Sequence, residues 1–333
     1  MNIKETNIKL DSHPRKNIFL KSINSIILIV IIVISMMFFS LRSENFLTLS
    51  NIITILISVS TIGIVCIGQT LLLLSGTFDI SVGSVVGFAG VILAKVLENF
   101  GVVDLGRSIL AILIVIFVGA AIGFINGILV TKIGINALIA TIAMLSIVIG
   151  LSMAITKGKY ININTPFFIA LGSYKIGNIL PVAMIILIIL YAGTYILLKT
   201  TVFGRYIYAI GNNETAAKYA GINVKRIRII LFTISSTASS IAGIILASKL
   251  TSAQAIFGAN YPLITIAACV LGGCLISGGK GGVLGSFLGI SFVLILRNGL
   301  IVNELPTHIQ DLVTGIILIV ALYISEFWVK KKA

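Results

Sequence analysis

The sequence predicts an all-α, polytopic membrane protein with about ten transmembrane helices. Hydrophobic residues make up 58% of the 333 residues and charged residues only 10%, with a mean hydropathy of +1.16. Soluble domains carry roughly 25% charged residues, so this chain has too few charges for a surface that faces water. Apolar runs recur at about 20 residues, the length that a helix needs to cross a bilayer. Lipid is therefore the expected solvent for most of the surface.

The expected spans form a transmembrane domain over residues 22–328, between a polar tail at 1–21 and a basic tail at 329–333. The third and eighth spans have fewer than about 20 apolar residues, and each either crosses the membrane or turns back within it. The ten spans are residues 23–41, 52–74, 82–97, 109–130, 135–155, 179–198, 229–248, 262–276, 283–300 and 309–328.

The ten spans divide into two sets of five, and each set contains one glycine- and serine-rich break. SGTFDISVGS (Ser75–Ser84) precedes the third span, and SGGKGG (Ser277–Gly282) precedes the ninth. Halves with an odd number of spans have opposite orientations, which is compatible with the inverted repeat of many transporters. SGGKGG does not fit a phosphate-binding loop, because Gly281 follows its lysine where that loop has Ser or Thr. We expect a tight turn there and no nucleotide site.

The longest polar interruption between spans is residues 199–228, which contain six of the 24 Lys/Arg residues and one acid. A short helix over residues 214–220 is expected within it. Asn212 or Asn213 can cap its N-terminus, where the acidic first residue also suits the helix dipole. Gly221 is the natural residue after its C-terminus. At roughly 11 Å, this helix is too short to cross a bilayer.

The distribution of positive charge predicts the orientation of the chain. Of the 24 Lys/Arg residues, 16 fall in the two tails and the alternate loops on the same side, and eight fall in the other loops. The positive-inside rule then places both termini and residues 199–228 in the cytoplasm. The net charge of +14 is explained by this bias, so no nucleic-acid partner is expected.

No metal, cofactor or disulfide framework is expected. Cys66, Cys269 and Cys274 lie in or beside apolar spans without paired spacing, and the two histidines, His13 and His308, are far apart in the sequence. No cluster of His, Glu and Asp has the spacing of a catalytic site, so an enzyme is not expected. No cleavable signal peptide is expected either, because no small-residue cleavage site clearly follows the first apolar run.

Four blocks of the sequence resemble the permease subunits of bacterial ATP-binding-cassette (ABC) sugar importers, the ribose, xylose, arabinose and galactoside group. They occur in that family's order between about residues 50 and 325. Thr77-Phe78 departs from the Gly-Ile that the family commonly has before the aspartate. The blocks are SGTFDISVGS (Ser75–Ser84), GFINGILV (Gly123–Val130) with the following Ile135–Gly150, GRYIYAIGNNETAAKYAGINV (Gly204–Val224) and ITIAACVLGGCLISGGKGGVLG (Ile264–Gly285).

The resemblance implies an inner-membrane importer for a monosaccharide, either a ribose-like pentose or a hexose. Its partners would be cytoplasmic ABC ATPase subunits, an extracytoplasmic solute-binding protein and a second permease subunit, either a copy or a paralogue. Related permeases carry nucleosides or furanosyl signalling molecules, and a secondary transporter or channel is the less favoured alternative. The family's ATPase-coupling element would fall on Glu214, Ala216, Ala217, Lys218 and Gly221; otherwise this segment is a loop bound to anionic lipid through its basic residues.

A pathway for an uncharged sugar needs neutral hydrogen-bonding groups. Each such residue could instead join neighbouring helices. Asp79 is the only acid in residues 52–97, and capping of the third span is favoured over lining a polar path or relaying protons. The pathway candidates are Gln69, Asp79, Asn126, Asn136, Thr141 and Ser146.

Overall fold

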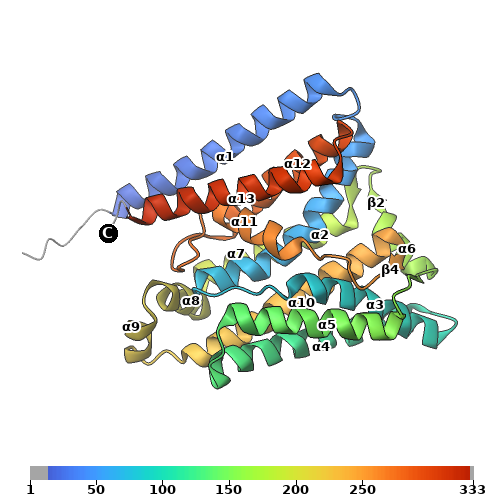
Figure 1. The fold of residues 1–333 in the computed structure, drawn as a ribbon, viewed down its shortest axis with the longest axis horizontal. Helices are drawn as coiled ribbons and strands as arrows, with labels where there is room; N and C mark the ends of the chain where they lie inside the picture. Colours follow the sequence, from blue (N-terminus) through green and yellow to red (C-terminus); the bar gives the residue numbers. More distant parts are fainter. Residues whose placement is uncertain (1–13, 331–333) are drawn as a thin grey trace, which may run out of the picture.

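The computed structural model describes residues 14–330, which form a bundle of long helices that run roughly side by side (Figure 1). The long helices match nine of the ten expected spans in order; most ends differ by up to five residues, and α1 begins nine residues before the expected first span. They are α1 (Pro14–Arg42), α2 (Leu49–Leu74), α3 (Val82–Phe100), α4 (Leu105–Ile128), α5 (Ala137–Thr156), α7 (Val182–Thr200), α10 (Val224–Leu250), α12 (Val283–Val302) and α13 (Thr307–Lys330).

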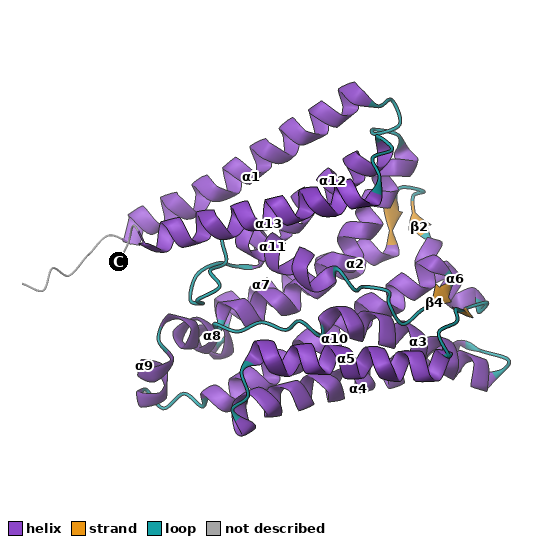
Figure 2. Ribbon diagram, in the orientation of Figure 1, coloured by secondary structure: helices purple, strands orange, loops and turns teal. Residues whose placement is uncertain are grey.

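Short elements connect the long helices (Figure 2). The strands pair in two small antiparallel ladders, β1 with β4 and β2 with β3. The short helices are η1 (Leu129–Ile133), a π-helical continuation of α4, with α6 (Pro166–Ser173), α8 (Val202–Asn212), α9 (Glu214–Tyr219) and α11 (Tyr261–Leu271). The strands are β1 (Ile161–Asn162), β2 (Lys175–Ile176), β3 (Leu180–Pro181) and β4 (Ser252–Ala253).

Within the described part of the chain, seven helices are long and apolar enough to cross a membrane: α2, α3, α4 with η1, α5, α7, α10 and α12. The expected polytopic, mostly helical architecture is therefore confirmed, whereas the count of ten spans is not. The third span is longer than expected, since α3 has 19 residues. The eighth is only partly helical: α11 has 11 residues and ends where Gly272 and Gly273 follow, so at roughly 16 Å it does not cross a bilayer as a single helix.

Helix α10 lies at the centre of the bundle and packs against α2, α3 and α4. Its approach to α4 depends on Gly119, Gly123 and Gly127, which lie at four-residue spacing on α4. A Cβ at Gly123 would overlap the carbonyl oxygen of Phe232, and one at Gly127 would lie 2.7 Å from Ile229 Cα. Small residues thus let the two backbones touch, as is common between membrane helices.

The two ends of the bundle differ. Helices α8 and α9 lie at one end, with the first turn of α1 and the last turn of α13, whereas α6, β2 and β4 lie at the other (Figure 1). The expected N-terminal tail, residues 1–21, falls largely outside the described residues, but its residues 14–21 belong to α1. Of the expected tail at 329–333, residues 329–330 continue α13, and the rest lies outside the described residues.

Candidate functional site

The segment between α7 and α10 contains two short helices, of which the sequence predicted only the second. Helix α8 begins where the Thr201 hydroxyl oxygen accepts a hydrogen bond from the N–H of Gly204 over 3.1 Å. Ile207 and Ile210 are its buried apolar residues. The cap and this three-residue spacing were a readable signal, but Gly204 and Gly211 within the same stretch argued against a helix.

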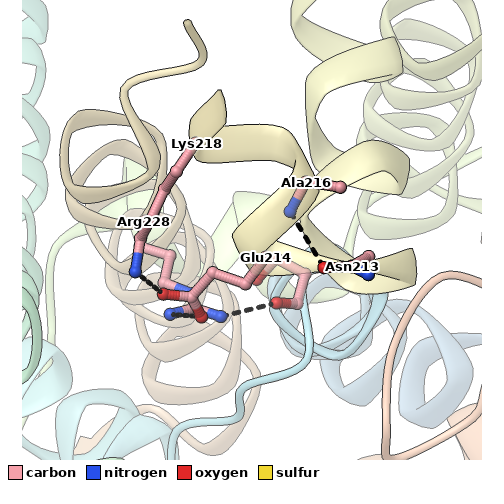
Figure 3. A network of polar contacts seen from close by, with 6 residues as sticks. Asn213, Glu214, Ala216, Lys218 and Arg228 are labelled. Carbon is pink, nitrogen blue, oxygen red and sulfur yellow. Dashed lines mark hydrogen bonds and ion pairs between the residues drawn. The ribbon is translucent and has the colours of Figure 1, made fainter. Parts of the chain in front are cut away.

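Helix α9 confirms the expected short helix and most of its capping. The side-chain oxygen of Asn213, rather than of Asn212, accepts the N–H of Ala216 over 2.9 Å (Figure 3). The helix ends at Tyr219, one residue earlier than expected. Gly221 follows with a φ of 80°, a conformation that glycine adopts without strain. Asn213 closes α8 and opens α9, so no linker separates the two helices.

Glu214 anchors α9 to α10 and to the end of α2. One carboxylate oxygen lies 2.6 Å from Lys218 Nζ and the other 2.8 Å from Arg228 Nη1 (Figure 3). Arg228 Nη2 also donates to the carbonyl oxygen of Ser75 over 3.1 Å. The hydrogen bond from Lys218, together with the positive charge of Arg228, lowers the pKa of Glu214 from its ordinary value. Arg228 therefore holds protein groups and is not available as the lipid-binding residue that the sequence allowed.

Fewer residues of α9 are exposed to a partner than the family resemblance implied. Ala217 is buried in the chain's own core, so it cannot contact a partner as the family resemblance implied. Ala216 and Lys218 are exposed. The sequence did not single out Tyr219, whose side chain is 89% exposed. Because Tyr is enriched in protein–protein interfaces, Tyr219 is a candidate contact residue.

Three pathway candidates form one buried polar cluster. Asp79 accepts hydrogen bonds from the N–H and hydroxyl of Ser81 at 2.8 and 2.6 Å. The Asn126 amide donates to the Ser81 hydroxyl over 2.9 Å, and the Asp79 N–H donates to the Gln69 side-chain oxygen over 3.4 Å. The expected capping role of Asp79 is wrong, because Ser81 occupies the N-cap position of α3. Asp79 instead accepts the hydrogen bonds of this cap residue. The cluster joins α2, the first break and α4.

The cluster is closed to solvent in this conformation. Gln69, Asp79 and Asn126 are each 0% exposed. One polar atom of each, Gln69 Nε2, Asp79 Oδ2 and Asn126 Oδ1, makes no hydrogen bond. Such atoms are costly when buried, so a rearrangement that gave them partners would be favourable.

The other three pathway candidates lie on α5, outside this cluster. Asn136 is exposed and accepts the N–H of Leu138 over 2.9 Å at the start of the helix. Thr141 is buried, and Ser146 is exposed. Both hydroxyls donate to carbonyl oxygens of their own helix, at 2.8 and 3.3 Å. The structure therefore does not bring them together with Gln69, Asp79 and Asn126.

The SGGKGG segment is the tight turn that the sequence predicted. Gly278, Gly279 and Gly281 all have positive φ, and Lys280 is exposed. The described residues contain no group of three or more His, Cys, Asp or Glu side chains placed to hold a metal ion. The three cysteines are free and buried.

Comparison with known proteins gives a family match over most of the chain. A family model described as the branched-chain amino acid transport system / permease component matches residues 51–322. The ribose import permease protein RbsC of Haemophilus influenzae is 34% identical over 311 residues, which are 92% of this chain and 93% of that protein. The L-arabinose transport system permease protein AraH of Escherichia coli is 37% identical over 86% of each chain. No solved structure matches the chain.

Proposed function

The chain belongs to the branched-chain amino acid transport system permease family, and on that premise we propose that it carries a monosaccharide across the inner membrane for an ABC importer driven by separate ATPase subunits. The chain is a multi-pass membrane protein, and its relatives are the permease components of ABC sugar importers. The named sugars of its relatives, ribose and L-arabinose, favour a pentose. A nucleoside or a furanosyl signalling molecule is the alternative solute.

The observation that carries the proposal is the anchored, partly exposed helix α9. Its Ala216, Lys218 and Tyr219 side chains are open to a partner. Its Glu214 is fixed to α10 and α2 through Arg228. A force applied to the exposed face would therefore reach two long helices at once. A secondary transporter is less favoured, because Asp79 is the one fully buried acid among the described side chains, and it already accepts two hydrogen bonds from Ser81.

The proposed orientation places α8 and α9 in the cytoplasm, with both termini on the same side. Coupling through Glu214, Ala216, Lys218 and Gly221 would then face cytoplasmic ATPase subunits, while Ala217 packs α9 onto its own chain. The α6 end would face the solute-binding protein, and a second permease subunit would complete the pathway. The excess of Lys and Arg in the two tails and in residues 199–228 supports this orientation. Ten spans over residues 22–328, as an inverted repeat of five, would require the residues after α11 to complete the eighth crossing.

Uptake into proteoliposomes tests the proposal. The permease is reconstituted with its ATPase subunits and its binding protein, and radiolabelled ribose and L-arabinose are supplied. We expect uptake of a sugar that requires ATP and persists with an ionophore. Uptake without ATP that an ionophore abolishes would instead indicate a secondary transporter.

Gly221→Arg tests whether α9 couples the ATPase subunits to transport. Arginine at a φ of 80° is strained and places bulk and charge beside the exposed face. We expect this variant to reach the membrane but to lose uptake. Gly158→Arg, after the end of α5 at a φ of 73° and with no atom within 4 Å of an added Cβ, is the matched control. Normal uptake by Gly221→Arg would contradict the coupling role.

A further inference from the structure

Three segments that are far apart in the sequence are in contact with one another. They are the end of α8, the first break after α2 and the second break before α12. The N–H of Gly279 donates to the carbonyl oxygen of Leu74 over 3.0 Å, so one hydrogen bond joins the second break to the last residue of α2, directly before the first break. Gly211 of α8 packs on that bond, because a Cβ there would overlap both the donor and the acceptor.

No side chain separates these backbones. A Cβ at Gly278 would lie 2.8 Å from the nitrogen of Gly76 and 2.9 Å from the Cα of Gly211. Gly76, Gly278 and Gly279 also have φ values of 77°, 92° and 74°, which favour glycine. We call Gly76, Gly211, Gly278 and Gly279 the glycine junction. Backbones packed this closely cannot shift independently, so a displacement of one segment moves the other two.

Hydrogen bonds and an ion pair hold the α8–α9 pair to each break separately. The Tyr208 hydroxyl of α8 donates to the carbonyl oxygen of Gly281 in the second break over 3.1 Å. Glu214 of α9 holds Arg228, which donates to Ser75 in the first break. The pair is therefore fixed to both breaks by contacts that do not depend on the junction itself.

We propose that α8, α9 and the two breaks move as one rigid unit at the glycine junction, so that a displacement of α9 reaches the first turns of α3 and α12 together. The first break leads into α3 at Val82, and the second leads into α12 at Val283. Gly211 is then a positioning residue that sets both breaks relative to α8. This inference rests on the proposed function, because it takes an ATPase as the source of the displacement.

A crosslink tests whether the unit is rigid. Asn212→Cys and Lys280→Cys introduce thiols at exposed neighbouring positions, since a Cβ at Gly279 would lie 2.8 Å from Asn212 Cγ. A short bismaleimide joins α8 to the second break in the reconstituted complex with its ATPase subunits and binding protein. We expect the same ATP hydrolysis, and the same uptake of ribose and L-arabinose, before and after crosslinking. Loss of ATP hydrolysis or uptake on crosslinking, with the reagent-treated wild type unaffected, would overturn the inference.

Gly211→Ala tests the junction itself. The added methyl must push α8 away from Leu74, and a shift of about 1 Å at such a contact should reduce sugar uptake by about tenfold or more. The ATPase subunits should still bind, because the α9 face is unchanged. Gly193→Ala, with open space around it in α7, is the control. Normal uptake by Gly211→Ala would overturn the junction, whereas absence of ATP-dependent uptake in the wild type would overturn the proposed function first.

Discussion

Arg228→Lys separates charge from geometry at the anchor of α9. The guanidinium holds Glu214 through Nη1 at 2.8 Å and the Ser75 carbonyl oxygen through Nη2 at 3.1 Å. Lysine keeps the positive charge but carries a compact ammonium that does not reproduce a planar fork. We expect the variant to keep one of these two bonds and lose the other. Loss of the bond to Glu214 detaches α9 from both helices, and loss of the bond to Ser75 detaches it from the end of α2 alone.

The expected cost follows from the exposure of the pair. A hydrogen bond to a charged group contributes about 1.5–3 kcal/mol. The Glu214 side chain is 36% exposed, so solvent screening reduces the loss toward about 1 kcal/mol. A change of about 1 kcal/mol shifts the equilibrium between anchored and detached α9 roughly fivefold.

Two measurements report this loss. Amide hydrogen exchange of residues 214–221 should be faster by about the same fivefold factor. The amount of sugar imported per ATP hydrolysed should fall, while the ATPase subunits still bind. Arg226→Lys, at an exposed position on the same turn of α10, is the matched control. Unchanged exchange and an unchanged transport ratio in Arg228→Lys would refute the anchor.

Three further predictions concern the anchor, the buried cluster and the helix packing. Because the pKa of Glu214 is lowered, its stabilisation of α9 is complete above the ordinary glutamate pKa and is lost as pH falls through the lowered value. The protection of residues 214–219 from exchange, relative to the intrinsic rate at each pH, should fall only in that acidic range, and a loss of protection near neutral pH would contradict the ion pairs. Asp79→Ala should lower the Tm in detergent, at a cost of about 2–4 kcal/mol, because two buried donors of Ser81 lose their acceptor. Asp79→Asn keeps an acceptor and should cost less; equal losses would show that the hydrogen bonds are unimportant. Gly123→Leu should prevent folding by separating α4 from α10, whereas Gly150→Leu, which meets open space on α5, should leave the Tm unchanged; a folded Gly123→Leu protein would contradict the close packing.

The sequence predicted features that depend on neighbouring residues. The cap at Asn213, the glycine after α9 and the turn at 277–282 are encoded within a few residues each, and all three are confirmed. The long apolar runs likewise located the long helices. The length of α11 was not predicted, because hydropathy continues past the point where Gly272 and Gly273 end the helix.

Contacts between distant segments were not readable. Glu214 and Arg228 come from different helices, and the Ser75 carbonyl is a backbone group without a sequence signal. Helix α8 was missed because Gly211 lowers helix propensity, and only the structure shows that its missing side chain makes room for Leu74. The burial of Ala217 also depends on how α9 rotates against the core.

Photo-crosslinking from the exposed face of α9 tests the central claim most directly. Tyr219→p-benzoylphenylalanine places a photoreactive group at a position whose side chain is 89% exposed. The crosslinking is done in membranes that contain the complete transporter complex. We predict a crosslink to an ATPase subunit. The same substitution at Tyr160, which is 65% exposed at the α6 end, should give no crosslink to that subunit. An ATPase crosslink from Tyr160 and none from Tyr219 would contradict both the orientation and the coupling role of α9.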